Sequence, residues 1–292
     1  MSCRLPLAIA VAVASAILSA GCGGTEGRDD EGKTTIVADG SNTMVNVAQA
    51  WAEDYHKRKP QINVQVLGGG SGVGIASLIN GTCDLANASR KMKEKEIARV
   101  KAKHGVEPKE FIVGYDALAV YVHKDHPLGT ISLEQLAGIY GDGGAIEDWS
   151  EVSDKAADLG KIIRISRQNS SGTYAYFRKA VLGEGRDYKL GSVDLSGSKD
   201  VVAMVARTPG AIGYSGMGYA TPEVKMLKIA KQDSPGVAPT VENAKGGTYP
   251  ITRPLHIYTI GEPTGVVKEY IDWILSPAGQ KVVVDLGYVP VD

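Results

Sequence analysis

The sequence predicts an α/β fold built around mainly parallel sheets. Three segments in series each combine a strand, a turn and a helix, and a similar unit begins again at Ile162. Units of this kind join parallel strands through right-handed helical crossovers, which place helices on the faces of the sheet. The 292 residues are enough for about two domains. With 43% hydrophobic and 22% charged residues, the composition excludes a disordered, fibrous or multi-spanning membrane protein.

The first unit begins with a short β-rich run at residues 34–38. The turn after it leads into a helix, with Ser41 as the expected N-cap. The apolar residues expected on one face of this helix are Met44, Ala48, Trp51 and Tyr55. Pro60 ends the helix, because proline cannot continue its hydrogen bonding.

The remaining elements follow from the same patterns. The second and third units predict strands at 62–67 and 84–88, with helices from Ser71 to about Asn80 and from about Lys93 to His104. A β run at 111–123 leads into the second half of the chain, where helices are expected near 201–207, 266–275 and 278–284. Residues 141–159 are polar and poorly periodic, so we expect a loop there.

The N-terminal residues 1–21 are typical of a secretion signal. Arg4 precedes an apolar run that is too short to span a bilayer comfortably but fits a signal-peptide core. The run ends in Leu18-Ser19-Ala20-Gly21-Cys22, which resembles the lipobox of bacterial lipoproteins, where the cysteine is acylated and becomes the first mature residue. Ser19 departs from the leucine that this pattern prefers.

We therefore expect Cys22 to carry a lipid that anchors the protein to the extracytoplasmic face of the cell envelope. Residues 22–32 are rich in glycine and charge and predict a flexible tether. Secretion without lipidation, with Cys22 lost or idle, is the alternative.

Composition and motifs argue against several other functions. A formal net charge of −1 gives no basic surplus for nucleic acid. Three cysteines without a Cys-x-x-Cys pair predict neither a disulfide framework nor zinc, and Cys83 is expected to be a buried structural thiol. His123 and His126 flank a turn and are expected to be solvated rather than a metal pair. The glycines of residues 68–74 miss the dinucleotide-binding spacing, so we expect no cofactor. The sequence also lacks a His-Glu-x-x-His motif, so we expect no metal.

Three turns, each between a strand and a helix, carry the chemistry. They are Gly40-Ser41-Asn42-Thr43, Gly70-Ser71-Gly72 and Ser170-Ser171-Gly172-Thr173. A helix N-terminus has unpaired N–H groups and a partial positive charge, small residues let the backbone approach an anion, and hydroxyls add donors. Any one turn is explained by helix capping alone. Three of them, with Arg90 and Arg167 in matching places, favour an oxyanion site.

These turns resemble those of the PstS-like family, the phosphate-binding proteins of the bacterial phosphate-specific ABC importer. The most specific match is Arg167-Gln168-Asn169-Ser170-Ser171-Gly172-Thr173, which is similar to the family's Arg-x-x-x-Ser-Gly-Thr motif. Further matches are Ile139-Tyr140-Gly141, Asp148-Trp149, residues 210–214, residues 249–255 and residues 275–280. The resemblance covers nearly all of residues 33–292.

The resemblance implies two α/β lobes that are joined by a two-strand hinge and close on one dehydrated phosphate. Lobe 1 would comprise residues 33–114 and 255–292, and lobe 2 residues 115–254. The ligand residues carried over by position are Ser41, Thr43, Ser71, Gly72, Ser89, Arg167, Ser171, Gly172 and Thr173, and we add their neighbours Asn42 and Arg90 as candidates. The implied partner is an ABC permease in the cytoplasmic membrane, with a monomeric binding protein and no catalytic residues.

One position departs from the longer family members. They have an aspartate directly after the Ala-Ser of the third strand, whereas Ala88-Ser89 is followed here by Arg90, which is similar to a shorter branch. This leaves open which carboxylate accepts the phosphate proton. Asp116 is our first candidate and Asp39 the second, because a buried aspartate without a partner would be costly.

Three other functions remain to be weighed. A binder of sulfate, molybdate or tungstate would use the same kind of site. A phosphate-sensing or adhesive surface lipoprotein would keep the fold without transport. A secreted phosphatase is disfavoured, because the sequence lacks metal-ligand clusters and an activated nucleophile.

Overall fold

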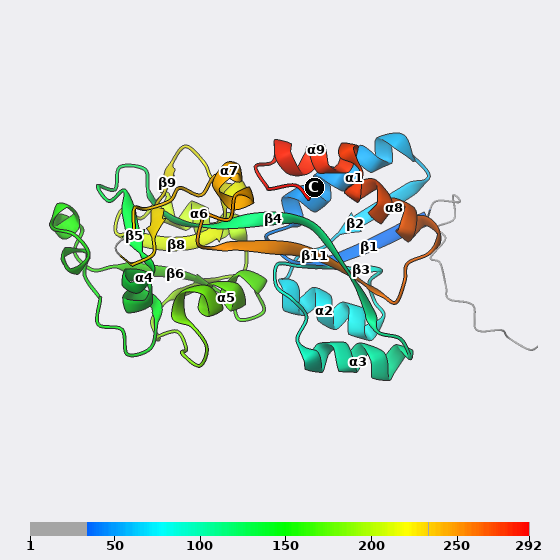
Figure 1. The fold of residues 1–292 in the computed structure, drawn as a ribbon, viewed down its shortest axis with the longest axis horizontal. Helices are drawn as coiled ribbons and strands as arrows, with labels where there is room; N and C mark the ends of the chain where they lie inside the picture. Colours follow the sequence, from blue (N-terminus) through cyan, green and yellow to red (C-terminus); the bar gives the residue numbers. More distant parts are fainter. Residues whose placement is uncertain (1–33, 233, 292) are drawn as a thin grey trace, which may run out of the picture.

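The computed structural model describes residues 34–232 and 234–291. Within them the predicted α/β class is confirmed, with helices packed on a sheet that runs through two lobes (Figure 1). The expected signal peptide, the expected tether at residues 22–32 and Cys22, the expected site of lipidation, lie outside the described residues. In the described part, no helix is long and apolar enough to cross a membrane.

A nine-stranded sheet links the lobes in the order β2-β1-β3-β11-β4-β8-β6-β7, with β9 paired to β4. The strand bounds are β1 (Thr34–Gly40), β2 (Ile62–Val66), β3 (Leu85–Ala88), β4 (Pro108–His123), β6 (Ile163–Arg167), β7 (Val193–Leu195), β8 (Ala211–Gly216), β9 (Val224–Met226) and β11 (Thr252–Ile260). β5 (Thr130–Ser132) and β10 (Lys228–Ala230) form a separate parallel pair. Pairing is parallel within β2-β1-β3 and within β8-β6-β7, and antiparallel wherever β4 or β11 takes part.

In lobe 1, helices lie on both faces of β2-β1-β3. α1 (Val45–Arg58), α8 (Gly265–Leu275) and α9 (Pro277–Asp285) pack together on one face (Figure 1). α2 (Ser71–Asn80) and α3 (Glu94–His104) cover the other face (Figure 1). The two faces hold separate clusters, one around Trp51, Tyr270 and Tyr288 and one around Ile75 and Leu78.

Lobe 2 is built around β6 and β8. Its helices are α4 (Leu133–Tyr140), α5 (Gly172–Phe177), α6 (Ser198–Val205) and α7 (Val241–Lys245). α5 continues directly into a π-helical turn, η3 (Arg178–Leu182). Short 3-10 helices η1 (Trp149–Glu151), η2 (Asp154–Leu159) and η4 (Met217–Tyr219) complete the lobe. Its single core includes Tyr140, Trp149, Phe177 and Tyr214.

β4 and β11 are the strands that both lobes share (Figure 1). Val113 and Leu255 belong to the core of lobe 1, while Ala117 and Ile251 belong to that of lobe 2. The pairing of β4 with β11 shifts register between Leu255 and His256. The short stretch between the two cores is therefore where the backbone passes from one lobe to the other.

Four local expectations have clear outcomes. The N-cap of α1 is Met44, so the expectation for Ser41 is wrong: its hydroxyl bonds to another side chain instead of capping the helix. Residues 141–159 contain η1 and η2 rather than only loop. His126 is buried against the Trp149 ring, and burial lowers its pKa to about 4, so it is not solvated. Cys83 is buried as predicted, and burial raises the pKa of its thiol to about 12.

Candidate anion-binding site

Five buried hydroxyl side chains from the predicted turns and from the end of β3 meet between the lobes. We call them the hydroxyl cluster: Ser41, Thr43, Ser71, Ser89 and Thr173. Ser89 Oγ lies 3.1 Å from Ser41 Oγ and 3.3 Å from Ser71 Oγ, and the hydroxyls of Thr43 and Thr173 are 2.8 Å apart across the lobes. Each can donate or accept a hydrogen bond. None of the five residues is more than 2% exposed.

Strand geometry explains the lobe 1 half of this cluster. β1 and β3 are parallel neighbours, so their carboxyl ends lie at the same edge of the sheet. Ser41 directly follows β1 and Ser89 directly follows β3, while Ser71 is the first residue of α2. The Ser89 N–H donates to Ser71 Oγ at 3.0 Å, which fixes the two turns against each other.

Lobe 2 contributes the third turn, between β6 and α5. Ser171 is the N-cap of α5, and its hydroxyl accepts the N–H groups of Thr173 and Tyr174 at 3.1 and 3.4 Å. A Cβ on Gly172 would lie 2.3 Å from Ser71 Oγ and 2.5 Å from Ser89 Oγ. Because that space is already filled, only glycine lets the lobe 2 backbone approach the hydroxyl cluster so closely.

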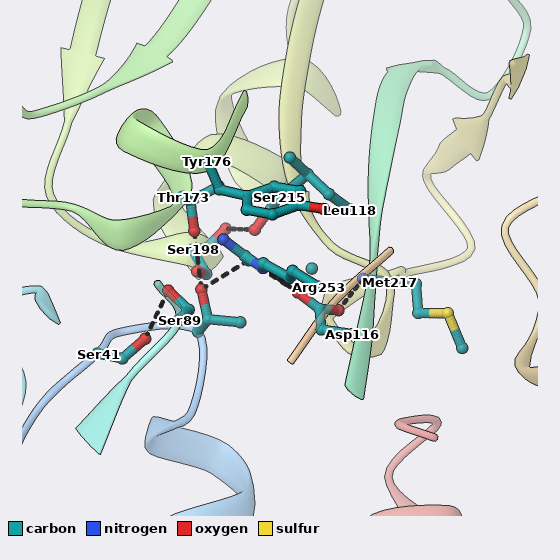
Figure 2. A network of polar contacts seen from close by, with 12 residues as sticks. Ser41, Ser89, Asp116, Leu118, Thr173, Tyr176, Ser198, Ser215, Met217 and Arg253 are labelled. Atoms are coloured by element: carbon teal, nitrogen blue, oxygen red, sulfur yellow. Dashed lines mark hydrogen bonds and ion pairs between the residues drawn. The ribbon is translucent and has the colours of Figure 1, made fainter. Parts of the chain in front are cut away.

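A buried ion pair between the shared strands lies beside the cluster (Figure 2). Arg253 on β11 is directly opposite Asp116 on β4, and its Nη2 donates to Asp116 Oδ2 at 2.7 Å. Asp116 Oδ1 accepts the Met217 N–H at 3.3 Å. Both side chains have zero exposure. Burial raises the pKa of Asp116, while the charge and hydrogen bonds of Arg253 act in the opposite direction.

Arg253 also reaches the hydroxyl cluster. The same Nη2 donates to Thr43 Oγ1 at 3.1 Å. The guanidinium carbon lies 5.8 Å from the centre of the Tyr176 ring, which covers it in Figure 2. Its Nη1 is buried and has no hydrogen-bond partner among the described residues. A buried guanidinium nitrogen without an acceptor is costly, which makes this donor available to an anion.

Arg167 is the second buried guanidinium, at the end of β6. It donates to the carbonyls of Leu195 and Ser196 at 3.2 and 2.5 Å, and to Ser198 Oγ at 3.0 Å. Burial, followed by the charge of Arg253, lowers the pKa of Arg167 to about 10. It therefore remains charged at neutral pH. Of these two buried cations, Arg253 pairs with Asp116, whereas Arg167 is hydrogen bonded only to carbonyls and a hydroxyl and keeps its positive charge available to an anion.

Two carried-over residues hold the lobes together. The Asn42 side chain donates to the Ser196 carbonyl at 2.6 Å, and the Gly72 N–H donates to the Ser170 carbonyl at 2.9 Å. Ser170 Oγ returns a bond to the Gly69 carbonyl at 3.1 Å. We call this set of residues the latch: Asn42, Gly69, Gly72, Ser170 and Ser196. In this structure the donors of Asn42 and Gly72 are thus directed at lobe 2 carbonyls.

Arg90 and the second carboxylate candidate, Asp39, are directed elsewhere. Arg90 forms a bidentate pair with Glu96, with both N–O distances at 2.8 Å. Asp39 accepts a hydrogen bond from Ser77 on α2 at 2.6 Å. Among the described residues, no carboxylate is hydrogen bonded to the hydroxyl cluster, and no group of three His, Cys, Asp or Glu side chains could hold a metal ion.

Arg253 is the site residue that the sequence analysis missed, although it stands inside one of the matching segments. A usable signal exists in the sequence: Arg253 interrupts an otherwise apolar β-run, and Asp116 does the same in the earlier one. Charged residues in buried strands require partners of opposite sign. Two buried strands that carry one charge each, of opposite sign, therefore predict that Arg253 and Asp116 form an ion pair.

Comparison with known proteins places this geometry in a family. The model of the PBP superfamily domain matches residues 26–278. The chain is 34% identical over 263 residues to the phosphate-binding protein PstS of Pseudomonas aeruginosa, covering 86% of this chain and 81% of the relative. It is also 34% identical over 264 residues to PstS of Bacillus subtilis, covering 90% and 83%.

Solved structures agree with these relatives. A substrate-binding protein of a phosphate ABC transporter from Clostridium perfringens, with bound phosphate, has a TM-score of 0.78 and 28% identity, covering 89% of this chain and all of that one. An ABC-type phosphate transport receptor from Vibrio cholerae has a TM-score of 0.68 and 26% identity, covering 88% of this chain and 100% of that one. The chain belongs to the PstS phosphate-binding proteins of the periplasmic-binding-protein superfamily.

Proposed function

We propose that this protein captures inorganic phosphate between its two lobes and delivers it to an ABC importer. The observation that carries this proposal is the hydrogen bond of Arg253 to the hydroxyl cluster, with the buried cation Arg167 close enough for the charge of Arg253 to lower its pKa. A dehydrated phosphate needs many fixed donors, which hydroxyls, guanidinium groups and the bare backbone at Gly172 supply. The relatives named as phosphate-binding proteins support the same ligand.

Both lobes contribute donors, so the ligand would stabilise the closed arrangement. Thr43 and Ser71 come from lobe 1, whereas Arg167 and Thr173 come from lobe 2. A ligand that bonds to both halves shifts the equilibrium toward the state in which they touch. We place the lobe boundaries at residues 114/115 and 254/255, within the strands that both lobes share. The closed shape is what a permease would recognise.

The decisive measurement is calorimetric titration of the soluble domain with phosphate, arsenate, sulfate, molybdate and tungstate. We expect micromolar or tighter binding of phosphate, which corresponds to about −8 kcal/mol or more, and similar binding of arsenate. Sulfate bound as tightly as phosphate would contradict phosphate selectivity. No binding of any oxyanion would contradict the proposed function.

The position of Asp116 keeps sulfate as the second candidate. Because its carboxylate bonds to Arg253 rather than to the hydroxyl cluster, it does not itself accept a ligand proton in this arrangement. We propose that it acts through Arg253, by limiting the positive charge offered to a fully ionised anion. Asp116→Asn should then raise sulfate affinity more than phosphate affinity, narrowing their ratio severalfold. An unchanged ratio in a stable variant would refute this role.

We further propose that Cys22 is acylated and tethers a monomeric protein to the extracytoplasmic face of the membrane, with transport rather than catalysis as its role. Cys22→Ala should move the protein from the membrane to the soluble envelope fraction. Mass spectrometry of the mature N-terminus would identify the lipid directly. A Cys22→Ala protein that stays in the membrane fraction would refute the anchor.

A further inference from the structure

A basic pocket of about 550 Å³ adjoins the hydroxyl cluster. Its charged and polar walls come from lobe 1 (Ser89, Arg90, Lys91, Lys93), from lobe 2 (Lys179) and from the shared strand β11 (Arg253, His256). No aspartate or glutamate lines it. Since the chain as a whole has a formal net charge of −1, this concentration of positive charge is local.

Acidic residues outside the lining contact four of the six basic wall residues. Glu96 pairs with Arg90, Glu184 lies 4.0 Å from Lys179, Glu110 contacts His256 at 2.8 Å and Asp116 pairs with Arg253. Lys91 and Lys93 are exposed, and neither forms a side-chain salt bridge with another described residue. Lys91 and Lys93 are therefore exposed cationic wall residues of the pocket without a salt bridge to another described side chain.

The pocket shares two wall residues with the proposed ligand site. Ser89 belongs to the hydroxyl cluster, and Arg253 donates to Thr43 within it. Among the described residues, Arg253 Nη1 and His256 Nε2 are buried without a hydrogen-bond partner, whereas His256 Nδ1 contacts Glu110. An anion held in the pocket would thus be one side chain away from the hydroxyl cluster.

We propose that the basic pocket is the first docking site of the phosphate anion, from which the anion passes to the hydroxyl cluster. This inference rests on the proposed phosphate-binding function. A cleft lined by one sign of charge between low-dielectric walls concentrates counter-ions and accelerates their association. The lysines then act on the rate of entry, whereas the hydroxyl cluster and the arginines hold the bound ligand.

The test combines Lys91→Gln, Lys93→Gln and Lys179→Gln in one variant of the full soluble domain. Stopped-flow fluorescence measures association and dissociation of phosphate at low salt and at about 0.5 M NaCl, where the Debye length falls to a few ångströms. We expect association to slow about tenfold at low salt, the difference to vanish at high salt, and dissociation to change less than about twofold. The control Lys57→Gln/Lys155→Gln/Lys281→Gln removes the same charge from exposed positions that do not line the pocket.

Two results would overturn the proposal. One is unchanged association in the triple variant. The other is a loss of affinity that falls on the dissociation rate of phosphate, because the pocket would then hold part of the bound ligand. Calorimetry of the wild-type protein with phosphate distinguishes failure of the proposed function from failure of the docking site. Absence of phosphate binding there refutes the proposed function, whereas normal binding with unchanged association refutes only the docking site.

Discussion

Two sets of contacts beside the hydroxyl cluster differ in chemistry: the Arg253–Asp116 pair on the shared strands and the latch between the lobes. The pair of Arg253 and Asp116 is ionic, fully buried and set on strands that hydrogen bond directly to each other. The latch lies nearer the surface and consists of neutral hydrogen bonds, all of them to backbone carbonyls. A buried ion pair is costly to break, whereas a neutral bond contributes only about 0.5–1.5 kcal/mol.

This difference fits a protein that must both bind and release. The ion pair lies on the shared strands, which hydrogen bond directly to each other. The contacts that must break during opening are weak and can exchange with water. Ser196 connects the two halves of the site, because its carbonyl accepts from Asn42 of the latch and from Arg167.

Replacing Arg253 should have the largest effect. Arg253→Ala removes a donor from the site and leaves Asp116 buried without a partner. We expect phosphate affinity to fall at least about 100-fold, or about 3 kcal/mol, and the free energy of unfolding to fall by about 3–5 kcal/mol. Calorimetry and thermal unfolding would measure the two losses.

A double variant separates binding from stability at this pair. Arg253→Met with Asp116→Leu replaces both charges by apolar groups, which often restores stability. We expect the double variant to be about as stable as the wild-type protein and still unable to bind phosphate tightly. Recovery of binding in it would show that Arg253 does not contact the anion.

Arg167→Ala should come next. Its guanidinium is buried, and the loss of this positive charge should weaken the binding of phosphate by about 2–3 kcal/mol. Arg167→Lys should recover only part of this affinity, because lysine cannot reproduce the planar set of donors. Titration with phosphate would show whether the affinity falls from the wild-type protein to Arg167→Lys and further to Arg167→Ala. Affinity like that of the wild-type protein in the alanine variant would exclude Arg167 from the site.

A smaller effect is expected at the latch. Asn42→Ala removes the bonds to the Ser196 carbonyl and from the Gly69 N–H, so phosphate should bind about tenfold more weakly, mainly through faster dissociation. Small-angle scattering at saturating phosphate should show unchanged closure. Asn46→Ala is the matched control, because Asn46 bonds to Tyr288 within lobe 1. Equal effects of both variants would argue against a role across the lobes.

The sequence predicts the turns of this site better than its charges. Gly172 and the neighbouring hydroxyl residues follow a strand directly, so their chemistry is readable from a short segment. Arg253 and Asp116 are 137 residues apart, and only the antiparallel register of β4 and β11 brings them together. Burial of His126 likewise depends on Trp149, which local periodicity does not reveal. These features depend on contacts between residues far apart in the chain, which local sequence patterns do not predict.

Arg90 should show the smallest effect on binding, because it belongs neither to the ion pair on the shared strands nor to the latch. Burial of Glu96 raises its pKa, but the hydrogen bonds and charge of Arg90, with the Lys93 N–H, outweigh burial and hold the pKa below its ordinary value. A carboxylate whose pKa is lowered by folding stabilises the protein above its ordinary pKa and loses this contribution as the pH falls. Arg90→Gln should therefore reduce stability by about 1–2 kcal/mol at neutral pH and flatten the acid side of the stability curve.

Phosphate affinity should change by less than about threefold, since the Arg90 guanidinium bonds to Glu96 instead of the hydroxyl cluster. Thermal unfolding between acid and neutral pH and calorimetry test both statements, and a tenfold loss of affinity would mean that Arg90 contacts the anion.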